Sequence, residues 1–184
     1  MASSATLFVD AVPIAALVPA HAGEFRESRN FDDRPIYVRG ISCIVLHATA
    51  DDGNEAAAEA WLCNPDSRVS AHLHIRRDGT IVRLVGDHFR AWHAGDSEWK
   101  GALHVNDFSL GWEIANRNDG HERFTPAQYS VLAQLGAHYL SQGLPLSAFV
   151  SHAEVALPRG RKTDPQGFDW MAFKIEVLRR YSEQ

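Results

Sequence analysis

Short runs of apolar residues, separated by polar turn residues, predict a chain of alternating strands and helices. The run 41–46 is rich in β-branched residues and follows Gly40, which is typical of a buried strand. Two further β-type runs, 69–75 and 80–85, flank the turn sequence Arg76-Arg77-Asp78-Gly79. Because Asp-Gly between such runs is a strong hairpin signal, we expect these two strands to pair antiparallel.

Three other segments carry helix signals. Segment 54–62 is rich in Ala and Glu and is stopped by Asn64-Pro65. Thr125-Pro126-Ala127-Gln128 combines an N-cap, a proline at the first helical position and a capping-box glutamine, and it opens a helix that Gly143 closes. A C-terminal helix is expected from its cap at Asp169 to Tyr181.

The remaining pattern completes the order of elements. Segment 108–116 alternates enough for a strand, and 148–151 is a last short strand before an irregular stretch, 153–167. Segment 86–107 loses periodicity but is rich in His and Trp, and such a long loop is expected to line a cleft. The order β-α-β-β-β-α-β-α predicts an α/β fold: a single domain with a mixed central sheet flanked by helices.

Length, composition and charge narrow the class of protein. The chain has 184 residues, 45% hydrophobic and 22% charged, which is typical of a soluble globular protein and excludes collagenous, coiled-coil and wholly disordered chains. We expect an N-terminal arm, 1–27, and one domain, 28–184, and for the oligomeric state a monomer. A net charge of −5 gives no basic surface, so neither nucleic acid nor a membrane is expected as a partner.

The N-terminal segment and the cysteines bear on the cellular location of the protein. The apolar stretch 7–22 contains Asp10 and two prolines, so it does not predict a membrane helix. Its end resembles a signal-peptide cleavage site, but residues 1–11 contain neither Lys nor Arg. We therefore expect an apolar arm packed on the domain and a cytoplasmic protein. Cys43 and Cys63 are too few for a disulfide scaffold and are expected to be reduced.

Two histidines at strand ends and one aspartate are candidates for a metal site. His47 and His152 each follow a predicted strand, and Asp164 comes twelve residues after His152. This spacing is not a short metal motif, and a histidine at a strand end is more often an ordinary surface or core residue. Two imidazoles and one carboxylate would nevertheless fill three corners of a zinc tetrahedron and leave the fourth for water.

Six blocks of sequence carry a resemblance to a known family. They are Ile-Val-Leu-His at 44–47, Arg-Val-Ser-Ala-His at 68–72, and the segments 75–82, 90–95, 106–113 and 161–165. In order and spacing they resemble the zinc-dependent N-acetylmuramoyl-L-alanine amidases, the amidase type 2 or peptidoglycan-recognition-protein-like fold. Within that family they are most similar to the cytoplasmic enzymes that trim anhydro-muropeptides during cell-wall recycling. The resemblance covers roughly residues 28 to 173.

The resemblance implies a role for five residues. The zinc ligands fall on His47, His152 and Asp164, the catalytic glutamate on Glu113, and the oxyanion-stabilising lysine on Lys162. It implies hydrolysis, by zinc-activated water, of the amide between N-acetylmuramic acid, or its 1,6-anhydro form, and L-alanine.

The residues themselves leave alternatives open at these positions. In a strand Glu113 shares a face with the small residues Gly111 and Ala115, which leaves room beside the carboxylate, but a solvated strand glutamate fits equally well. Lys162, two residues before Asp164, can face the same cavity or be a plain surface charge.

Four further residues are candidates for substrate binding: Trp92, His93, Asn106 and Arg161. Trp92 and His93 could contact a sugar or peptide, although core packing accounts for Trp92 as well. Asn106 could fix the loop instead of the substrate, and Arg161 could be solvated. His72 is expected to be structural or to line the cleft, and His74 to be incidental.

Three residues depart from the family pattern, and two other functions remain open. Ser151 and Gln166 stand where glycine is usual and Trp112 replaces a smaller residue; we expect them to reshape the loop of Asp164 and the cleft floor. The alternatives are a lytic amidase acting on intact peptidoglycan, either a phage endolysin or an exported autolysin, and a non-catalytic peptidoglycan-recognition module. Because all ligand and catalytic positions are filled, catalysis is favoured over binding alone.

Overall fold

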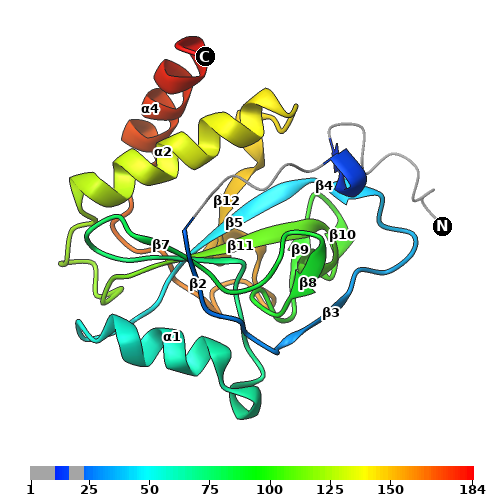
Figure 1. The fold of residues 1–184 in the computed structure, drawn as a ribbon, viewed down its shortest axis with the longest axis horizontal. Coiled ribbons are helices and arrows are strands. Elements are labelled where there is room, and N and C mark those ends of the chain that lie inside the picture. The colour runs from blue at the N-terminus through cyan, green and yellow to red at the C-terminus, as the bar shows by residue number, and fades with distance from the viewer. Residues whose placement is uncertain (1–10, 17–22) are drawn as a thin grey trace.

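A six-stranded sheet lies at the centre of the computed structural model, which describes residues 11–16 and 23–184 (Figure 1). Its order is β12 (Phe149–Ser151), β5 (Cys43–Ala48), β11 (Ser109–Ile114), β6 (Leu73–Ile75), β7 (Ile81–Arg83) and β2 (Glu24–Phe25). Neighbouring strands run parallel except β6 and β7, which are antiparallel. The predicted mixed α/β sheet and its antiparallel hairpin are confirmed.

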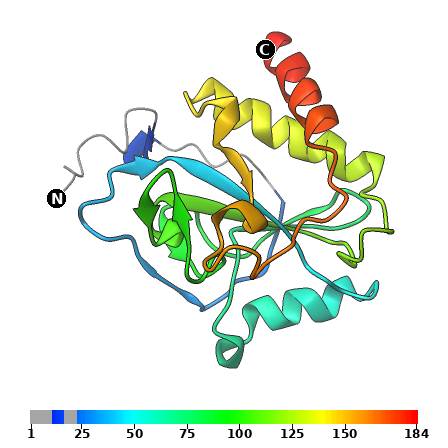
Figure 2. The same cartoon turned by 180° about the vertical axis from the view of Figure 1, so that it is seen from behind.

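Helices cover both faces of this sheet. Helix α1 (Glu55–Cys63) lies on one side, and α2 (Pro126–Ser141) and α4 (Trp170–Ser182) lie on the other (Figures 1 and 2). Trp112 of β11 is fully buried, with its ring 5.7 Å from that of Tyr139 on α2. The α2 side of the sheet therefore holds the large apolar core, which leaves the α1 side available for a functional site.

The ends of the helices follow their sequence signals. The capping box of α2 is complete, with Thr125 and Gln128 each accepting from the other's backbone, and Gly143 beyond its end has a φ of +101°. Asn54 caps α1 and Asp169 caps α4. The three predicted helices are thus confirmed to within a residue or two at each end.

Two segments expected to be irregular contain short elements. Segment 86–107 includes β8 (Phe89–Ala91), β9 (Glu98–Trp99), β10 (Ala102–Leu103) and the start of a 3-10 helix, Val105–Phe108. Segment 153–167 lies mostly within a loop, but α3 (His152–Val155) enters it, capped by Ser151. These elements are too short for a periodic pattern, and β8 pairs with β3 (Phe31–Asp33), far away in sequence, so local patterning does not reveal them. The strand expected over 69–75 is also shorter, because the Ser70 backbone N–H pairs with Trp92 in the loop.

The described parts of the N-terminal arm contact the domain. Strand β1 (Val12–Pro13) pairs with β4 (Gly40–Ile41), and β2 forms an edge of the main sheet. The cleavage-like sequence at 18–22 and residues 1–10 lie outside the described residues. The remaining 3-10 turns are Ile14–Ala16, Pro65–Ser67 and Leu146–Ala148. Among the described helices, none combines the length and apolar character needed to cross a membrane.

Candidate active site

The candidate site lies at the carboxyl ends of neighbouring parallel strands. His47 is the second-last residue of β5, and Glu113, the second-last residue of β11, is its direct partner in register. His152 follows β12 directly. Because these strands run parallel, their ends meet at one edge of the sheet, where the loop after α3 brings in Asp164.

Three side chains present metal-donor atoms to one point. The Nδ1 atoms of His47 and His152 are 3.0 Å apart, and Oδ2 of Asp164 lies 3.1 Å from His152 Nδ1 and 3.4 Å from His47 Nδ1. Donors held at about 2.0–2.1 Å around a tetrahedral zinc ion lie roughly 3.3 Å apart. The three residues are buried and form a potential metal-ligand group. Their spacing and their donor types therefore fit zinc.

The protonation states of this group also suit a cation. Burial, together with the nearby His152, lowers the pKa of His47 to about 4, so its imidazole is neutral at pH 7. Burial alone would raise the pKa of Asp164, but hydrogen bonds and charge interactions with the two histidines outweigh it and hold this pKa well below its usual range. Neutral imidazole and ionised carboxylate are the forms that bind zinc.

Glu113 points into the same space, and one of its carboxylate oxygens has no partner among the described residues. Its Oε2 atom is buried and makes no hydrogen bond to any described residue. The pKa of Glu113 is raised to about 8, first by burial and then by the nearby Asp164, while Lys162 partly offsets both. A cation held beside it would favour the ionised form. An orphaned carboxylate oxygen at this place indicates that water or a ligand completes its hydrogen bonding.

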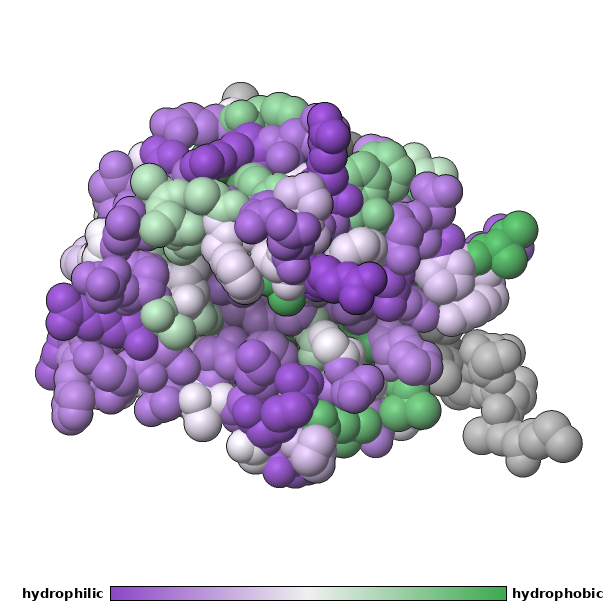
Figure 3. Space-filling view, turned by 90° about the horizontal axis from the view of Figure 1, so that it is seen from below, coloured by the Kyte–Doolittle hydropathy of each residue, from purple (hydrophilic) through white to green (hydrophobic). Residues whose placement is uncertain are grey.

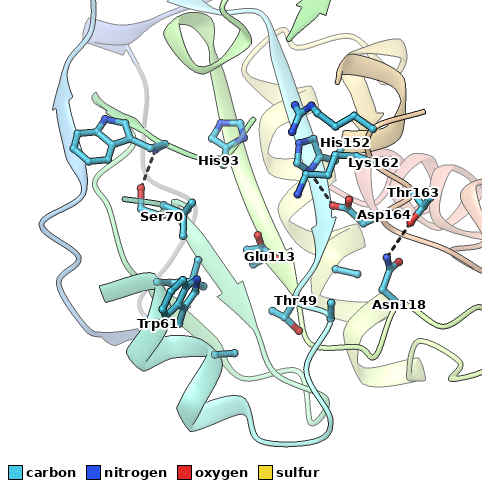
Figure 4. A pocket seen from close by; sticks show the side chains of 17 residues that line it. Thr49, Trp61, Ser70, His93, Glu113, Asn118, His152, Lys162, Thr163 and Asp164 are labelled. Atoms are coloured by element: carbon cyan, nitrogen blue, oxygen red, sulfur yellow. Dashed lines mark hydrogen bonds and ion pairs between the residues drawn. The ribbon is translucent and has the colours of Figure 1, made fainter. Parts of the chain in front are cut away.

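A cavity of about 430 Å³ opens in front of these groups, within the range of small-molecule sites (Figure 4). Its lining includes Glu113, His152, Lys162 and Asp164, together with Trp61 from α1. Seen from the α1 side, the surface is mostly hydrophilic, with hydrophobic residues in small separate groups (Figure 3). Because Glu113, Lys162 and Asp164 are among its lining residues, the cavity suits a polar substrate better than a lipid.

His93 and Asn106 are built into the wall behind the candidate ligands. His93 Nδ1 lies 3.1 Å from His47 Nε2, and burial lowers the pKa of His93 well below its usual range. Asn106 Oδ1 accepts hydrogen bonds from the backbone N–H groups of His93 and Ala94. Both contacts are structural, and binding of substrate by these two residues stays a prediction.

Arg161 and Trp92 also line the cavity, and each already donates hydrogen bonds to other parts of the protein. Arg161 Nη2 donates to the carbonyls of Ala94 and Asp96, and Trp92 Nε1 donates to Asp32. Arg161 therefore ties two loops together at the rim. A role for either residue in binding substrate stays a prediction.

Other expectations near the site have mixed outcomes. Trp112 does not reach the cleft floor, because strand alternation places it on the α2 face, so that expectation is wrong. Ser151 caps α3, and Gln166 Nε2 donates to Thr163 beside Asp164, so Gln166 does contact the loop. His72 is fully buried and accepts from the Gly111 N–H.

Two residues at the site were missed in the sequence. Trp61 is 58% exposed and lines the cavity with Ala58 and Leu62, a spacing on one helix face that could have revealed it. Asn118 has a positive φ of 55°, and its Oδ1 accepts from the Gln166 N–H at 2.7 Å, which anchors the loop of Asp164. No local signal marks that contact.

Comparison with known proteins identifies the class. Residues 37–167 match the family described as N-acetylmuramoyl-L-alanine amidase, and the chain therefore belongs to this family, as the sequence blocks indicated. Escherichia coli K12 has a relative described as 1,6-anhydro-N-acetylmuramyl-L-alanine amidase AmpD, which is 40% identical over 112 residues. That alignment covers 60% of this chain and 59% of the relative, so the chain spans about three fifths of the length of the curated relatives it matches.

Solved structures support the same fold. A crystal structure of a selenomethionine derivative of AmpD superposes with a TM-score of 0.68 and 31% identity, covering 84% of this chain and 94% of that one. The amidase AmiD from E. coli, in complex with anhydro-N-acetylmuramic acid-L-Ala-D-γ-Glu-L-Lys, gives a TM-score of 0.65 and 29% identity over 79% of this chain and 60% of that one.

Proposed function

We propose that this protein is an N-acetylmuramoyl-L-alanine amidase that hydrolyses the amide between N-acetylmuramic acid, or its 1,6-anhydro form, and L-alanine in muropeptides. One observation carries the proposal: two imidazole nitrogens and a carboxylate oxygen converge at the edge of a cavity that Glu113, with its orphaned Oε2, also lines. The activities named for AmpD and AmiD support it.

His47, His152 and Asp164 would hold a zinc ion in this site. When bound, zinc lowers the pKa of water to about 7 and polarises a carbonyl oxygen. The three residues keep one corner of the coordination sphere free of protein, as catalytic zinc sites require.

Glu113 moves the proton in this proposal. Its carboxylate accepts a proton from the water that attacks the lactyl carbonyl carbon. As the C–N bond breaks, Glu113 returns that proton to the nitrogen of L-alanine, so the products are a free carboxyl group and a free amine. Burial raises the pKa of Glu113 and so strengthens it as a proton acceptor, while a cation in the site would keep it ionised before the reaction.

Lys162 stabilises the charge that develops on the carbonyl oxygen. It lines the same cavity as Glu113 and belongs to the loop that carries Asp164. A fixed cation there interacts most strongly with the tetrahedral oxyanion, which exists only after attack. Cys43 is no alternative nucleophile, because it is fully buried and burial raises the pKa of its thiol.

We further propose that soluble anhydro-muropeptides are the preferred substrate and that the protein acts in the cytoplasm. The compact cavity and the name of the E. coli relative support this preference. The test is digestion of an anhydro-muropeptide and of intact sacculi at equal enzyme concentration, with released peptide measured by mass spectrometry. Faster cleavage of sacculi would favour a lytic enzyme, and tight binding without cleavage would favour a recognition module.

A further inference from the structure

A chain of polar contacts runs behind His47, on the side away from His152 and Asp164. Ser109 Oγ donates to the carbonyl oxygen of Val105 at 2.6 Å. His93 Nε2 lies 3.1 Å from this Oγ, and His93 Nδ1 lies 3.1 Å from His47 Nε2. Ser109, His93 and His47 are all buried, so these side chains hydrogen-bond to each other and to the protein, not to bulk water.

The protons in this chain can be placed by counting donors and acceptors. The Ser109 hydroxyl has one proton, and the Val105 carbonyl can only accept it. Ser109 Oγ therefore accepts from His93, which puts the ring proton of His93 on Nε2. A neutral imidazole has only one N–H, so His93 Nδ1 is an acceptor and His47 must donate to it from Nε2. The reverse direction would leave two oxygen atoms 2.6 Å apart with no proton between them.

We infer that Ser109 and His93 are positioning residues that hold His47 as the Nε2–H tautomer and so keep its Nδ1 lone pair directed at His152 and Asp164. The inference deepens the metal site of the proposed function. A lone pair on Nδ1 is what a metal ion requires, and the usual outer partner of a ligand histidine is a carboxylate, a carbonyl or water. Here that partner is a second histidine, whose own tautomer is set by a serine.

The adjacent peptide does the same for the second histidine. His152 Nε2 lies 3.3 Å from the carbonyl oxygen of Ala94, which can only accept, and His152 Nδ1 lies 3.1 Å from Oδ2 of Asp164. With a metal ion on Nδ1, the ring proton of His152 is on Nε2 and Ala94 accepts it. One short segment, His93-Ala94, thus supplies the outer acceptor for both imidazoles.

Packing holds this segment in place. A Cβ atom at Gly111 would lie 2.3 Å from Cγ of His93, so the ring rests directly on the backbone of β11. Asn106 Oδ1 binds the N–H groups of His93 and Ala94, at 3.2 and 2.8 Å. The acceptors are therefore rigidly placed before any ligand arrives.

Ser109→Ala tests the serine, with Ser42→Ala as its matched control. Ser42 is also buried, but its Oγ makes no hydrogen bond to any described residue. We expect Ser109→Ala to weaken zinc binding roughly 10- to 100-fold, measured by competition with a chromophoric chelator, and Ser42→Ala to leave it unchanged. Equal zinc affinity in the two variants would overturn the inference.

A pair of substitutions of similar size tests the acceptor on residue 93. Asn in His93→Asn keeps an acceptor near the Nδ1 position, whereas Leu in His93→Leu removes it. We expect His93→Asn to retain most of the zinc affinity and His93→Leu to lose at least as much as Ser109→Ala. Identical losses in both variants would show that only the volume of the ring matters.

Long-range ¹H–¹⁵N NMR of the metal-free wild type reads the tautomer directly and needs no variant to fold. We expect His47 and His93 to be protonated on Nε2; a proton on Nδ1 of His47 would overturn the inference. The measurement is independent of substrate. A protein with the expected tautomers but without amidase activity would refute the proposed function and leave this inference standing.

Discussion

Replacing Glu113 with glutamine should stabilise the metal-free protein at alkaline pH and remove most of its turnover. Both effects arise from one feature, a carboxyl group that lies in a buried position with an unpartnered oxygen. The glutamine side chain keeps the shape but cannot ionise. The variant therefore separates the cost of holding a charge in the fold from the use of that charge in proton transfer.

The size and sign of the stability effect follow from the pKa. Folding raises the pKa of Glu113 from 4.5 to about 8, chiefly by burial. At about 1.4 kcal/mol per pKa unit, this rise corresponds to at most about 5 kcal/mol. The folded state favours the protonated carboxyl of Glu113. The stabilisation that results is complete below pH 4.5 and is lost as the pH rises through about 8. The advantage of Glu113→Gln should be small at pH 5 and largest at pH 9.

Urea denaturation of chelator-treated protein at these two pH values measures the effect. Other titrating groups are present in wild type and variant and cancel to first order in the difference. Glu27→Gln, at an exposed position, is the control and should show no such pH dependence. A difference between Glu113→Gln and wild type that is the same at pH 5 and pH 9 would refute the reasoning from burial.

The zinc-loaded variant tests the catalytic role. Loss of a positioned general base lowers turnover by roughly two to four orders of magnitude. Zinc content should stay at the wild-type level, because Glu113 is not among the three converging donors. Turnover near that of the wild type would assign Glu113 a structural role and require another base.

The remaining predictions concern the metal, the lysine and the wall behind the site. His47→Ala should empty the zinc site while exposed His121→Ala keeps about one zinc per chain, by elemental analysis; equal zinc in both would contradict the assignment. Lys162→Ala should lower kcat far more than it changes KM, because its partner charge develops in the transition state, whereas a pure KM defect would make it a binding residue. Gly111→Ala should cost about 1–3 kcal/mol in urea unfolding, because the new Cβ lies 2.3 Å from a ring atom of His93; unchanged stability would mean that the ring moves away freely.

Local patterning alone determined most of the regular structure. The capping box at Thr125 and Gln128, the cap at Asp169 and the Asp78-Gly79 turn each act over a few residues, and each lies where it was expected. The apolar run that became β5 is completely buried, as its composition indicated. Such features are readable because the interactions that create them join near neighbours in the chain.

The sequence also predicted the candidate site, through the six blocks that resemble a known family. The resemblance predicted His47, His152 and Asp164 as a group, and the fold places their donor atoms 3.0–3.4 Å apart. Parallel strands put the ends of β5 and β11 at one edge, so His47 and Glu113 become register partners. The order of strands, which no local pattern contains, makes them neighbours.

Only the tertiary structure decided what the surrounding residues do. His93 and Arg161 were predicted to bind substrate, which stays a prediction, and the fold adds contacts that the sequence did not indicate: His93 backs His47, and Arg161 donates to backbone carbonyls about 65 residues away in sequence. Ser109 shows no motif of its own, although it fixes the direction of the hydrogen bonds behind His47. The type of a side chain sets which hydrogen bonds it can make. Which partner it meets depends on long-range packing, and therefore the sequence determined the chemistry available here and the fold determined how it is used.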